Sequence, residues 1–172
     1  MAWTPPRTWV AGEQPTAAIF NTHIRDNFLA LDTGPYSYAH LNADVAAGTS
    51  GVWTDITSWS VDNSDTVTYS GGTWTLPPAG RYLVFASISY TANATGSRGI
   101  RPVINGVVGQ NILVPTVTTA TYQATVQIYN EVVLGAASTI KFQAHQNSGG
   151  ALNLRGDTAG LYSRVGVRRV GN

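Results

Sequence analysis

Apolar and polar residues alternate along most of the chain beyond residue 50, and this pattern predicts β-strands. The clearest example is the apolar series Tyr82, Val84, Ala86, Ile88 and Tyr90. A period of two places alternate side chains on opposite faces of a strand. The expected strands cover residues 52–61, 66–76, 81–90, 99–108, 121–133, 139–146, 151–155 and 161–170. About eight short strands separated by turns predict an antiparallel sandwich or jelly roll.

Dipeptides with a known turn chemistry separate several of these strands. Asn105-Gly106 lies between two short β-branched runs and is the favoured pair for a type I′ hairpin. Gly71-Gly72 and Gly149-Gly150 also adopt positive φ at little steric cost. We therefore expect tight reversals at these three places.

A different period, of three and four residues, predicts an amphipathic helix from Thr16 to Leu31. Thr16 is a suitable N-cap. The apolar stripe contains Ala17, Phe20, Ile24, Phe28 and Leu31. The same stretch fits two heptads of a short coiled coil with Asn27 at a core position. An isolated helix of this length is marginal in water, so the stripe should dock on the head, on sister helices or on a neighbouring protein.

The helix divides the chain into three expected parts. Residues 1–33 form an N-terminal arm and helix, residues 34–50 a linker of small residues, and residues 51–172 the β-rich head. The arm contains Trp3 and Trp9 among prolines, so it is neither regular helix nor central strand. Two tryptophans on an extended arm need a surface to bury them, either on this chain or on another protein.

Composition narrows the classes of partner. Ten Lys and Arg residues nearly balance nine Asp and Glu residues, and no basic cluster predicts binding to nucleic acid or to an anionic membrane. Cysteine is absent, which excludes disulfides, thiolate metal sites and a cysteine nucleophile. No apolar run approaches the roughly 20 residues of a membrane helix, and the N-terminus lacks the layout of a secretory signal. We expect a protein made in the cytoplasm.

Catalytic and metal-binding patterns are weak in this sequence. Asp55, Asp62 and Asp65 fall on or beside early strand and turn positions, where aspartate commonly caps a turn. The three histidines are far apart and have no metal-ligand spacing. The segment 62–65 offers oxygens for calcium but lacks the ligand count of a dedicated loop. We expect no catalytic residues, no metal, no cofactor and no enzymatic activity.

Aromatic residues are the remaining candidates for a site. Aromatic rings in shallow grooves stack on sugar faces, but in a sandwich they more often fill the core or a subunit interface. The residues concerned are Trp53, Trp59, Trp74, Tyr36, Tyr38, Tyr69 and Tyr122. We favour core or interface for this set.

Several segments of the last 120 or so residues together resemble the C1q/TNF-like jelly-roll family. The run LPPAGRYLV at residues 76–84 resembles the entry to its central strand, and ANATGSRGIR at 92–101 with VING at 103–106 resembles the following hairpin in bacterial and phage members. Late in the chain, VLG at 133–135, QNSGGALN at 146–153 and LYSRVGVRRVG at 161–171 match the final strands. Gly135-Ala136 replaces the usual Gly-Asp and no collagen-like stem precedes the head, so the secreted animal members are poor functional models.

The N-terminal stretch is similar to a leader that recurs on structural proteins of tailed phages. The matching pieces are WVAGE at 9–13, PTAA at 15–18, NTHIRDN at 21–27 and LAL at 29–31. This resemblance implies a virion component whose leader attaches to capsid or tail. We expect the attachment residues to be Trp3, Trp9, Phe20, Ile24, Phe28 and Leu31.

Together the resemblances imply a homotrimer that decorates the capsid or forms a minor capsid or tail component and stabilises the particle. The alternative is a receptor-binding tail fibre or tip that recognises a host surface glycan or protein. Its ligand loops would contain Asn93, Thr95, Arg98 and Asn111.

Overall fold

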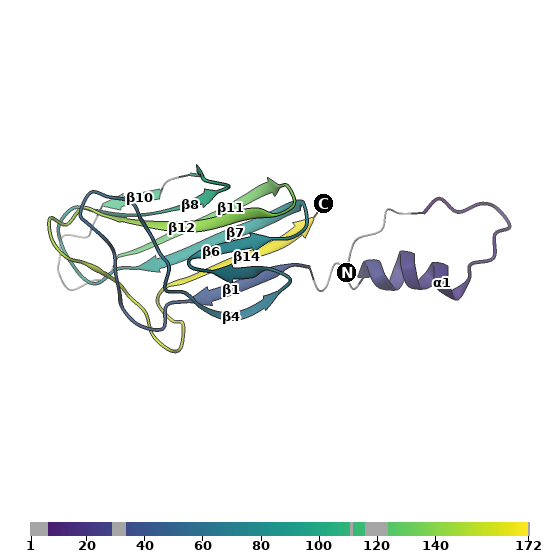
Figure 1. The fold of residues 1–172 in the computed structure, drawn as a ribbon, viewed down its shortest axis with the longest axis horizontal. Coiled ribbons are helices and arrows are strands. Elements are labelled where there is room, and N and C mark those ends of the chain that lie inside the picture. The colour runs from purple at the N-terminus through teal and green to yellow at the C-terminus, as the bar shows by residue number, and fades with distance from the viewer. Residues whose placement is uncertain (1–6, 29–33, 111, 116–123, 172) are drawn as a thin grey trace.

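A computed structural model of the protein describes residues 7–28, 34–110, 112–115 and 124–171. In these ranges two antiparallel sheets pack face to face as a sandwich (Figure 1). The first sheet has the order β11 (Thr125–Leu134), β7 (Gly80–Ser89), β14 (Arg164–Gly171), β1 (Tyr36–His40) and β4 (Ser60–Asp65). The fold is therefore the mainly antiparallel jelly roll that the alternation predicts.

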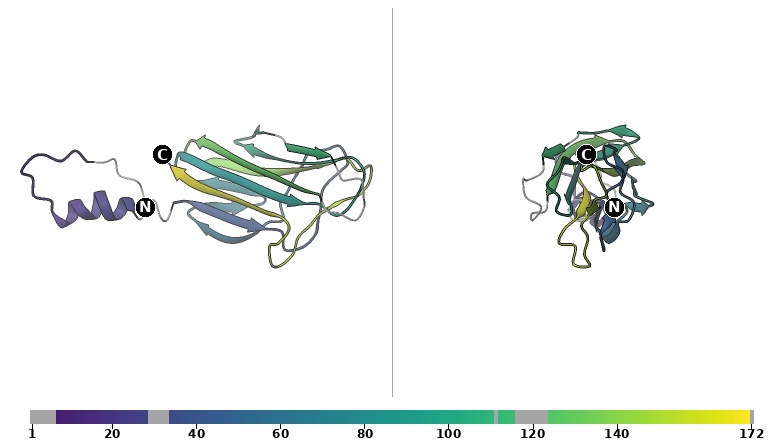
Figure 2. Two further views of the ribbon diagram at one scale, coloured as in Figure 1. Left: turned by 180° about the vertical axis from the view of Figure 1, so that it is seen from behind. Right: turned by 90° about the vertical axis from the view of Figure 1, so that its left-hand side faces the viewer.

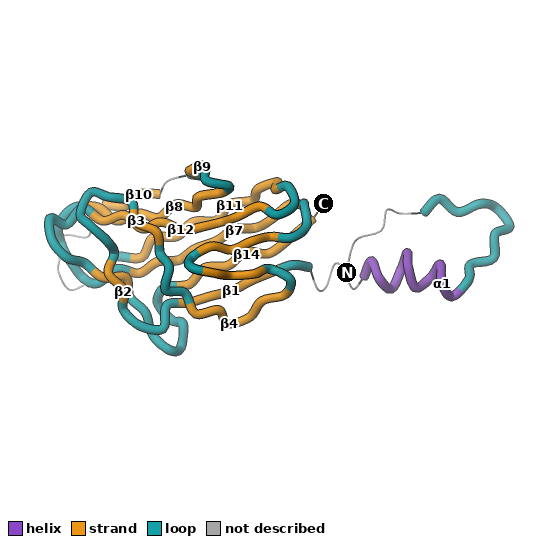
Figure 3. Tube along the Cα trace, in the orientation of Figure 1, coloured by secondary structure: helices purple, strands orange, loops and turns teal. Residues whose placement is uncertain are grey.

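The second sheet covers the other side of the core (Figure 3). Its order is β10 (Ile112–Pro115), β8 (Ser97–Ile104), β12 (Ser138–Gln146), β6 (Thr73–Leu76) and β5 (Thr68–Ser70), with β3 (Thr54–Asp55) beside β12 and β9 (Val107–Val108) beside β8. A short ribbon of β2 (Val45–Ala46) and β13 (Asn153–Leu154) lies outside both sheets.

The core lies between the sheets and is built by the alternating residues. The apolar series of β7 is almost completely buried, from Tyr82 to Ile88. Trp74 lies at the centre, with ring centroids 5.5 Å from Phe142 and 6.1 Å from Trp59. Its indole N–H donates to Ser37 Oγ at 3.1 Å, so the one polar atom of this ring is satisfied inside the core.

The hairpin predicted at Asn105-Gly106 is confirmed. Both residues have positive φ, 50° and 78°, as a type I′ turn requires. The Asn105 side chain also accepts a hydrogen bond from Thr139 N at 2.7 Å, which ties the turn to β12.

Residues 34–50 are not a linker, in contrast to the expectation from the sequence. β1 lies between β14 and β4 in the first sheet, and Leu41 is fully buried directly after it. The inward side chains of β1 are the small Ser37 and Ala39, because the large Trp74 occupies the space beneath this strand. A strand with small residues on its buried face has the composition of a linker, which is why the pattern was misleading.

The predicted helix is present, but part of it is not α-helical. Thr16 caps it, since its side chain accepts from Ile19 N at 3.4 Å. After α1 (Ala17–Phe20) the chain makes a π-helical turn, Asn21–Arg25, and remains helical to residue 28. The expected end at Leu31 lies outside the described residues. Figures 1 and 2 show this helix beyond one end of the sandwich rather than on a face of it.

Candidate functional site

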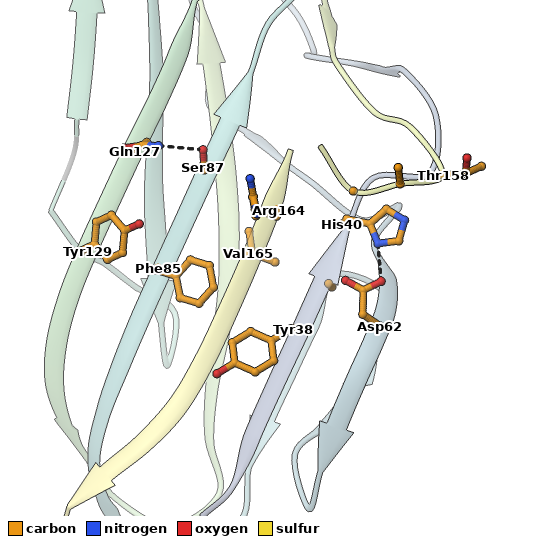
Figure 4. A pocket seen from close by; sticks show the side chains of 13 residues that line it. Tyr38, His40, Asp62, Phe85, Ser87, Gln127, Tyr129, Thr158, Arg164 and Val165 are labelled. Atoms are coloured by element: carbon orange, nitrogen blue, oxygen red, sulfur yellow. Dashed lines mark hydrogen bonds and ion pairs between the residues drawn. The ribbon is translucent and has the colours of Figure 1, made fainter. Parts of the chain in front are cut away.

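A row of aromatic rings crosses the outer face of the first sheet. Tyr38, Gly166, Phe85 and Tyr129 occupy one register row on the neighbouring strands β1, β14, β7 and β11. The ring centroids of Tyr38 and Phe85 lie 5.9 Å apart, and those of Phe85 and Tyr129 lie 6.0 Å apart and nearly parallel. We call these three rings the aromatic row (Figure 4).

Gly166 makes the aromatic row continuous. A Cβ atom at this position would lie 2.3 Å from Phe85 Cε1 and 2.6 Å from Tyr38 Cδ1. The two rings therefore lie over the central strand in the space that a side chain would take. Tyr129 is 66% exposed at the end of the row, so this large apolar surface faces solvent in the single chain.

A hollow of about 640 Å³ extends from the aromatic row toward the end of the sheet farther from the helix. Much of its remaining wall is polar, because the next register row contains Gln127, Ser87, Arg164 and His40 on the same four strands. Asp62 of β4, the 158–160 segment and the apolar Ala39 and Val165 complete the lining. We call this second part the polar end of the hollow.

His40 and Asp62 form an ordered pair at the polar end. A register shift between β1 and β4 sets Asp62 between residues that face Tyr38 and Ala39, and Asp62 Oδ1 lies 2.5 Å from His40 Nδ1. An ionised carboxylate only accepts, so Nδ1 is the donor and Nε2 of a neutral ring is an acceptor. His40 is 8% exposed, and its Nε2 is buried without a hydrogen-bond partner among the described residues.

The same face carries unpaired positive charge along its central strand. Arg164 and Arg168 are both exposed on β14, and within the described ranges neither forms an ion pair. Glu131 at the edge is already engaged with Arg81 at 3.2 Å. The middle of the face is thus cationic, and its acidic groups lie toward the two edges.

The outer face of the second sheet carries a ladder of polar contacts. The Arg101 guanidinium lies 4.3 Å from the centroid of the Trp53 ring, and Arg101 Nε donates to Gln143 at 2.7 Å. Gln143 in turn donates to Asp55, and this bond together with Lys141 lowers the pKa of the Asp55 carboxyl. Since Arg101 lies over the Trp53 ring and the centroid of the His145 ring lies 5.0 Å from that of Trp53, the ring is not an open platform for sugar stacking.

The predicted attachment residues lie together where they can be described. Trp9 of the arm contacts Phe20 with ring centroids 6.4 Å apart. Phe20, Ile24 and Phe28 remain 45%, 40% and 69% exposed. The arm therefore touches the helix without covering its stripe, while Trp3 and Leu31 lie outside the described residues.

The predicted ligand loop is partly structural. Asn93 Oδ1 accepts from Thr95 N at 2.8 Å in a local turn. Arg98 is fully buried, and its guanidinium donates to the carbonyl oxygens of Thr95 and Ser97, so its expected place on a ligand-facing surface is wrong. The sequence did not indicate the burial of Arg98, because arginine side chains are rarely fully buried in proteins. Asn111 lies outside the described residues.

The described part of the chain contains no group of three or more His, Cys, Asp or Glu side chains arranged for a metal ion. None of its helices has the length and hydropathy of a membrane span. The pairing of His40 with Asp62 could not be predicted from the sequence, because residues 62–65 have the composition of a turn although they lie on β4.

Comparison with known proteins defines the fold. No family model matches the sequence, and no curated protein matches it. Among solved structures, murine APRIL at pH 5.0 superposes with a TM-score of 0.60 and 10% identity, over 79% of this chain and 98% of that one. Eiger TNF from S. frugiperda superposes with a TM-score of 0.59 and 12% identity, over 81% and 94%. The head is therefore a TNF-like jelly roll, and identity this low shows the fold alone.

Proposed function

We propose that this chain is a non-catalytic structural component of a tailed-phage virion, in which three heads assemble through the aromatic row and the N-terminal arm and helix attach the trimer to capsid or tail. The exposed aromatic row is the observation on which this proposal depends. The number three and the phage setting come from the family resemblances of the head and of the leader. The proposed location is the virion.

Burial of the aromatic row favours association physically. An aromatic side chain removes roughly 150–250 Å² from water when buried, at about 25 cal/mol per Å². Soluble proteins seldom leave a contiguous patch of this kind uncovered. A cyclic trimer covers the patch on every copy, because each subunit contacts two neighbours around the threefold axis.

The exposed apolar residues of the N-terminal helix support the proposal that this part of the chain attaches the trimer to the particle. Phe20, Ile24 and Phe28 stay exposed on a helix that lies beyond the end of the sandwich (Figure 2). Three copies of a modest apolar surface on one trimer bind with increased avidity if the partner sites are spaced to match. A capsid or tail, with its repeated subunits, offers such spacing.

The first test measures mass in solution by light scattering for the full chain and two double variants. The face variant is Phe85→Ser with Tyr129→Ser. The control, Val107→Ser with Val108→Ser, removes residues that are 70% and 46% exposed on the other sheet. We expect trimers for the wild type and the control, and monomers for the face variant. A monomeric wild type, or a trimeric face variant, would overturn this assembly mode.

A second test measures the attachment of the protein to phage particles. The variant Phe20→Ser, Ile24→Ser and Phe28→Ser should remain trimeric but should no longer sediment with phage particles that lack the protein. Equal sedimentation of this variant and the wild type would contradict attachment through the leader.

The alternative function is a receptor-binding tip that recognises a host surface glycan or protein. The hollow favours it, because its polar end is lined by His40, the last residue of β1. β1 ends on the side of the head away from the helix (Figure 1). A tip and a decoration protein differ in one observable: only loss of the tip abolishes adsorption to host cells while leaving the particle intact.

A further inference from the structure

Arg168 lies on the outer face of the first sheet, two residues beyond Gly166 on the central strand β14. Its side chain is exposed in the single chain. Its direct neighbours in register are Tyr36 on β1 and Leu83 on β7, and neither offers it a carboxylate. A guanidinium keeps its charge in proteins, so burial of this row in an interface leaves a cation that needs a partner.

The acidic groups of the same register row lie two strands away on either side. Glu131 on β11 already forms an ion pair with Arg81 at 3.2 Å. Asp65 on β4 is opposite Tyr36, so β1 separates it from Arg168. In the described part of the chain Arg168 forms no ion pair. Its own copy therefore supplies no direct counter-charge among the described residues.

Arg164, on the same face of the same strand, has different surroundings. It lines the hollow, which leaves room for water beside its guanidinium when the faces pack, whereas Arg168 is not part of that lining. The two arginines are about 13 Å apart along the strand. The rings of Tyr38 and Phe85 lie over the strand between them, at Gly166 (Figure 4). Burial of the face should therefore remove water from Arg168 but not from Arg164.

The symmetry of the proposed trimer restricts the partner of Arg168. One Arg168 from each copy approaches the threefold axis, so three guanidinium groups surround one point. Each presents donors in a planar fork that matches the oxygens of a phosphate group. A tetrahedral oxyanion has a threefold axis of its own and can present three equivalent oxygens to the three forks. Its multiple negative charge also offsets the repulsion among the three cations.

From these observations we infer that the three Arg168 side chains of one trimer bind a single tetrahedral oxyanion, sulfate or phosphate, on the threefold axis. The inference rests on the proposed function, because no single copy contains the whole site. An anion that binds the trimer and not the separate chains strengthens the assembly by mass action. The concentration of the oxyanion thus regulates how tightly the three heads associate.

The test measures the trimer association constant of the full chain by sedimentation equilibrium at a constant ionic strength of about 0.1 M. Sodium chloride is replaced stepwise by sodium sulfate or sodium phosphate, and sodium nitrate serves as a threefold-symmetric anion of single charge. The variant is Arg168→Gln. Its matched control is Arg164→Gln, which removes an exposed arginine from the same face of the same strand.

We expect ~10 mM sulfate or phosphate to raise the association constant about tenfold over chloride or nitrate, as linkage predicts for an anion dissociation constant of about 1 mM. The logarithm of the association constant, plotted against the logarithm of the sulfate concentration, should approach a slope of about one, which corresponds to one anion per trimer. Arg164→Gln should keep this response and Arg168→Gln should lose it. Because Arg168→Gln retains the aromatic row, it also measures any general strengthening of apolar contacts by sulfate.

The inference is overturned if sulfate and phosphate act no more strongly than chloride, or if Arg168→Gln responds as the wild type does. A limiting slope of about three would also overturn it, because each copy would then bind an anion of its own. Loss of the response in Arg164→Gln would do the same by placing the anion in the hollow. A wild type that is monomeric in every anion contradicts the proposed assembly itself, whereas a trimer that ignores the anion contradicts only this site, so the two failures are distinguishable.

Discussion

Gly166 is important because it has no side chain. Rings from two other strands lie over its backbone, and a Cβ atom would come within 2.6 Å of both. Gly166→Ala should force Phe85 and Tyr38 apart and destabilise the fold by about 1 kcal/mol, at the low end for overpacking because both rings are only partly buried. Thermal unfolding followed by near-ultraviolet circular dichroism measures both the stability and the ring environment.

Gly135→Ala is the matched control for this prediction. No heavy atom lies within 4 Å of the Cβ position at Gly135, so its melting temperature and aromatic spectrum should stay unchanged. If Gly166→Ala behaves like Gly135→Ala, the rings have room to move and the aromatic row is not fixed by the glycine.

The sequence predicts little of this at the level of single residues. A glycine inside a strand indicates that something approaches closely, but not what approaches. Tyr38 and Phe85 become its neighbours only through the pairing of β1, β14 and β7. Likewise, nothing local indicates that His40 faces Asp62, because that contact depends on a register shift between two strands.

At the level of elements, periodicity predicted the long strands well and the short ones poorly. β7 has ten residues, and its inward series Tyr82, Val84, Ala86 and Ile88 is apolar throughout and almost completely buried, as the period of two predicts. β1 has five residues with Ser37 and Ala39 inward, and these small side chains give no apolar signal. The helix was predictable from its stripe, but its π-helical turn was not.

The placement of β1 inside the sheet predicts where the chain can be shortened. A truncated chain that begins at Gly34 keeps β1 and should retain the cooperative unfolding of the head. One that begins at Gly51 loses β1 with its two neighbour pairings and the buried Leu41, and should fail to fold. Circular dichroism and thermal melts of the two chains provide the measurement.

The opposite outcome is equally informative. If the chain that begins at Gly51 melts cooperatively near the temperature of the longer one, then β1 and the buried Leu41 contribute little to the stability of the head. The full chain serves as the reference for both truncations.

For the whole molecule, the charge pattern of the face limits how copies assemble. Arg164 and Arg168 flank Gly166 on the central strand, so packing three aromatic rows together brings six guanidinium groups near one axis. Like charges repel, and the repulsion is screened over about 10 Å at 0.1 M salt but over about 3 Å at 1 M. The trimer should therefore become tighter as salt rises, whereas an interface held by ion pairs would become weaker.

Two variants separate this charge effect from the general strengthening of apolar contacts by salt. Arg168→Gln removes one cation from each copy, and it should tighten the trimer at low salt and reduce the salt dependence of its dissociation constant, as measured by sedimentation equilibrium. Arg81→Gln changes a cation that already pairs with Glu131, so it should not tighten the trimer. A trimer that weakens with salt would mean that acidic groups of one copy, Asp62 or Glu131, meet the arginines of the next, and the three faces would then contact one another at their edges rather than through the central strand.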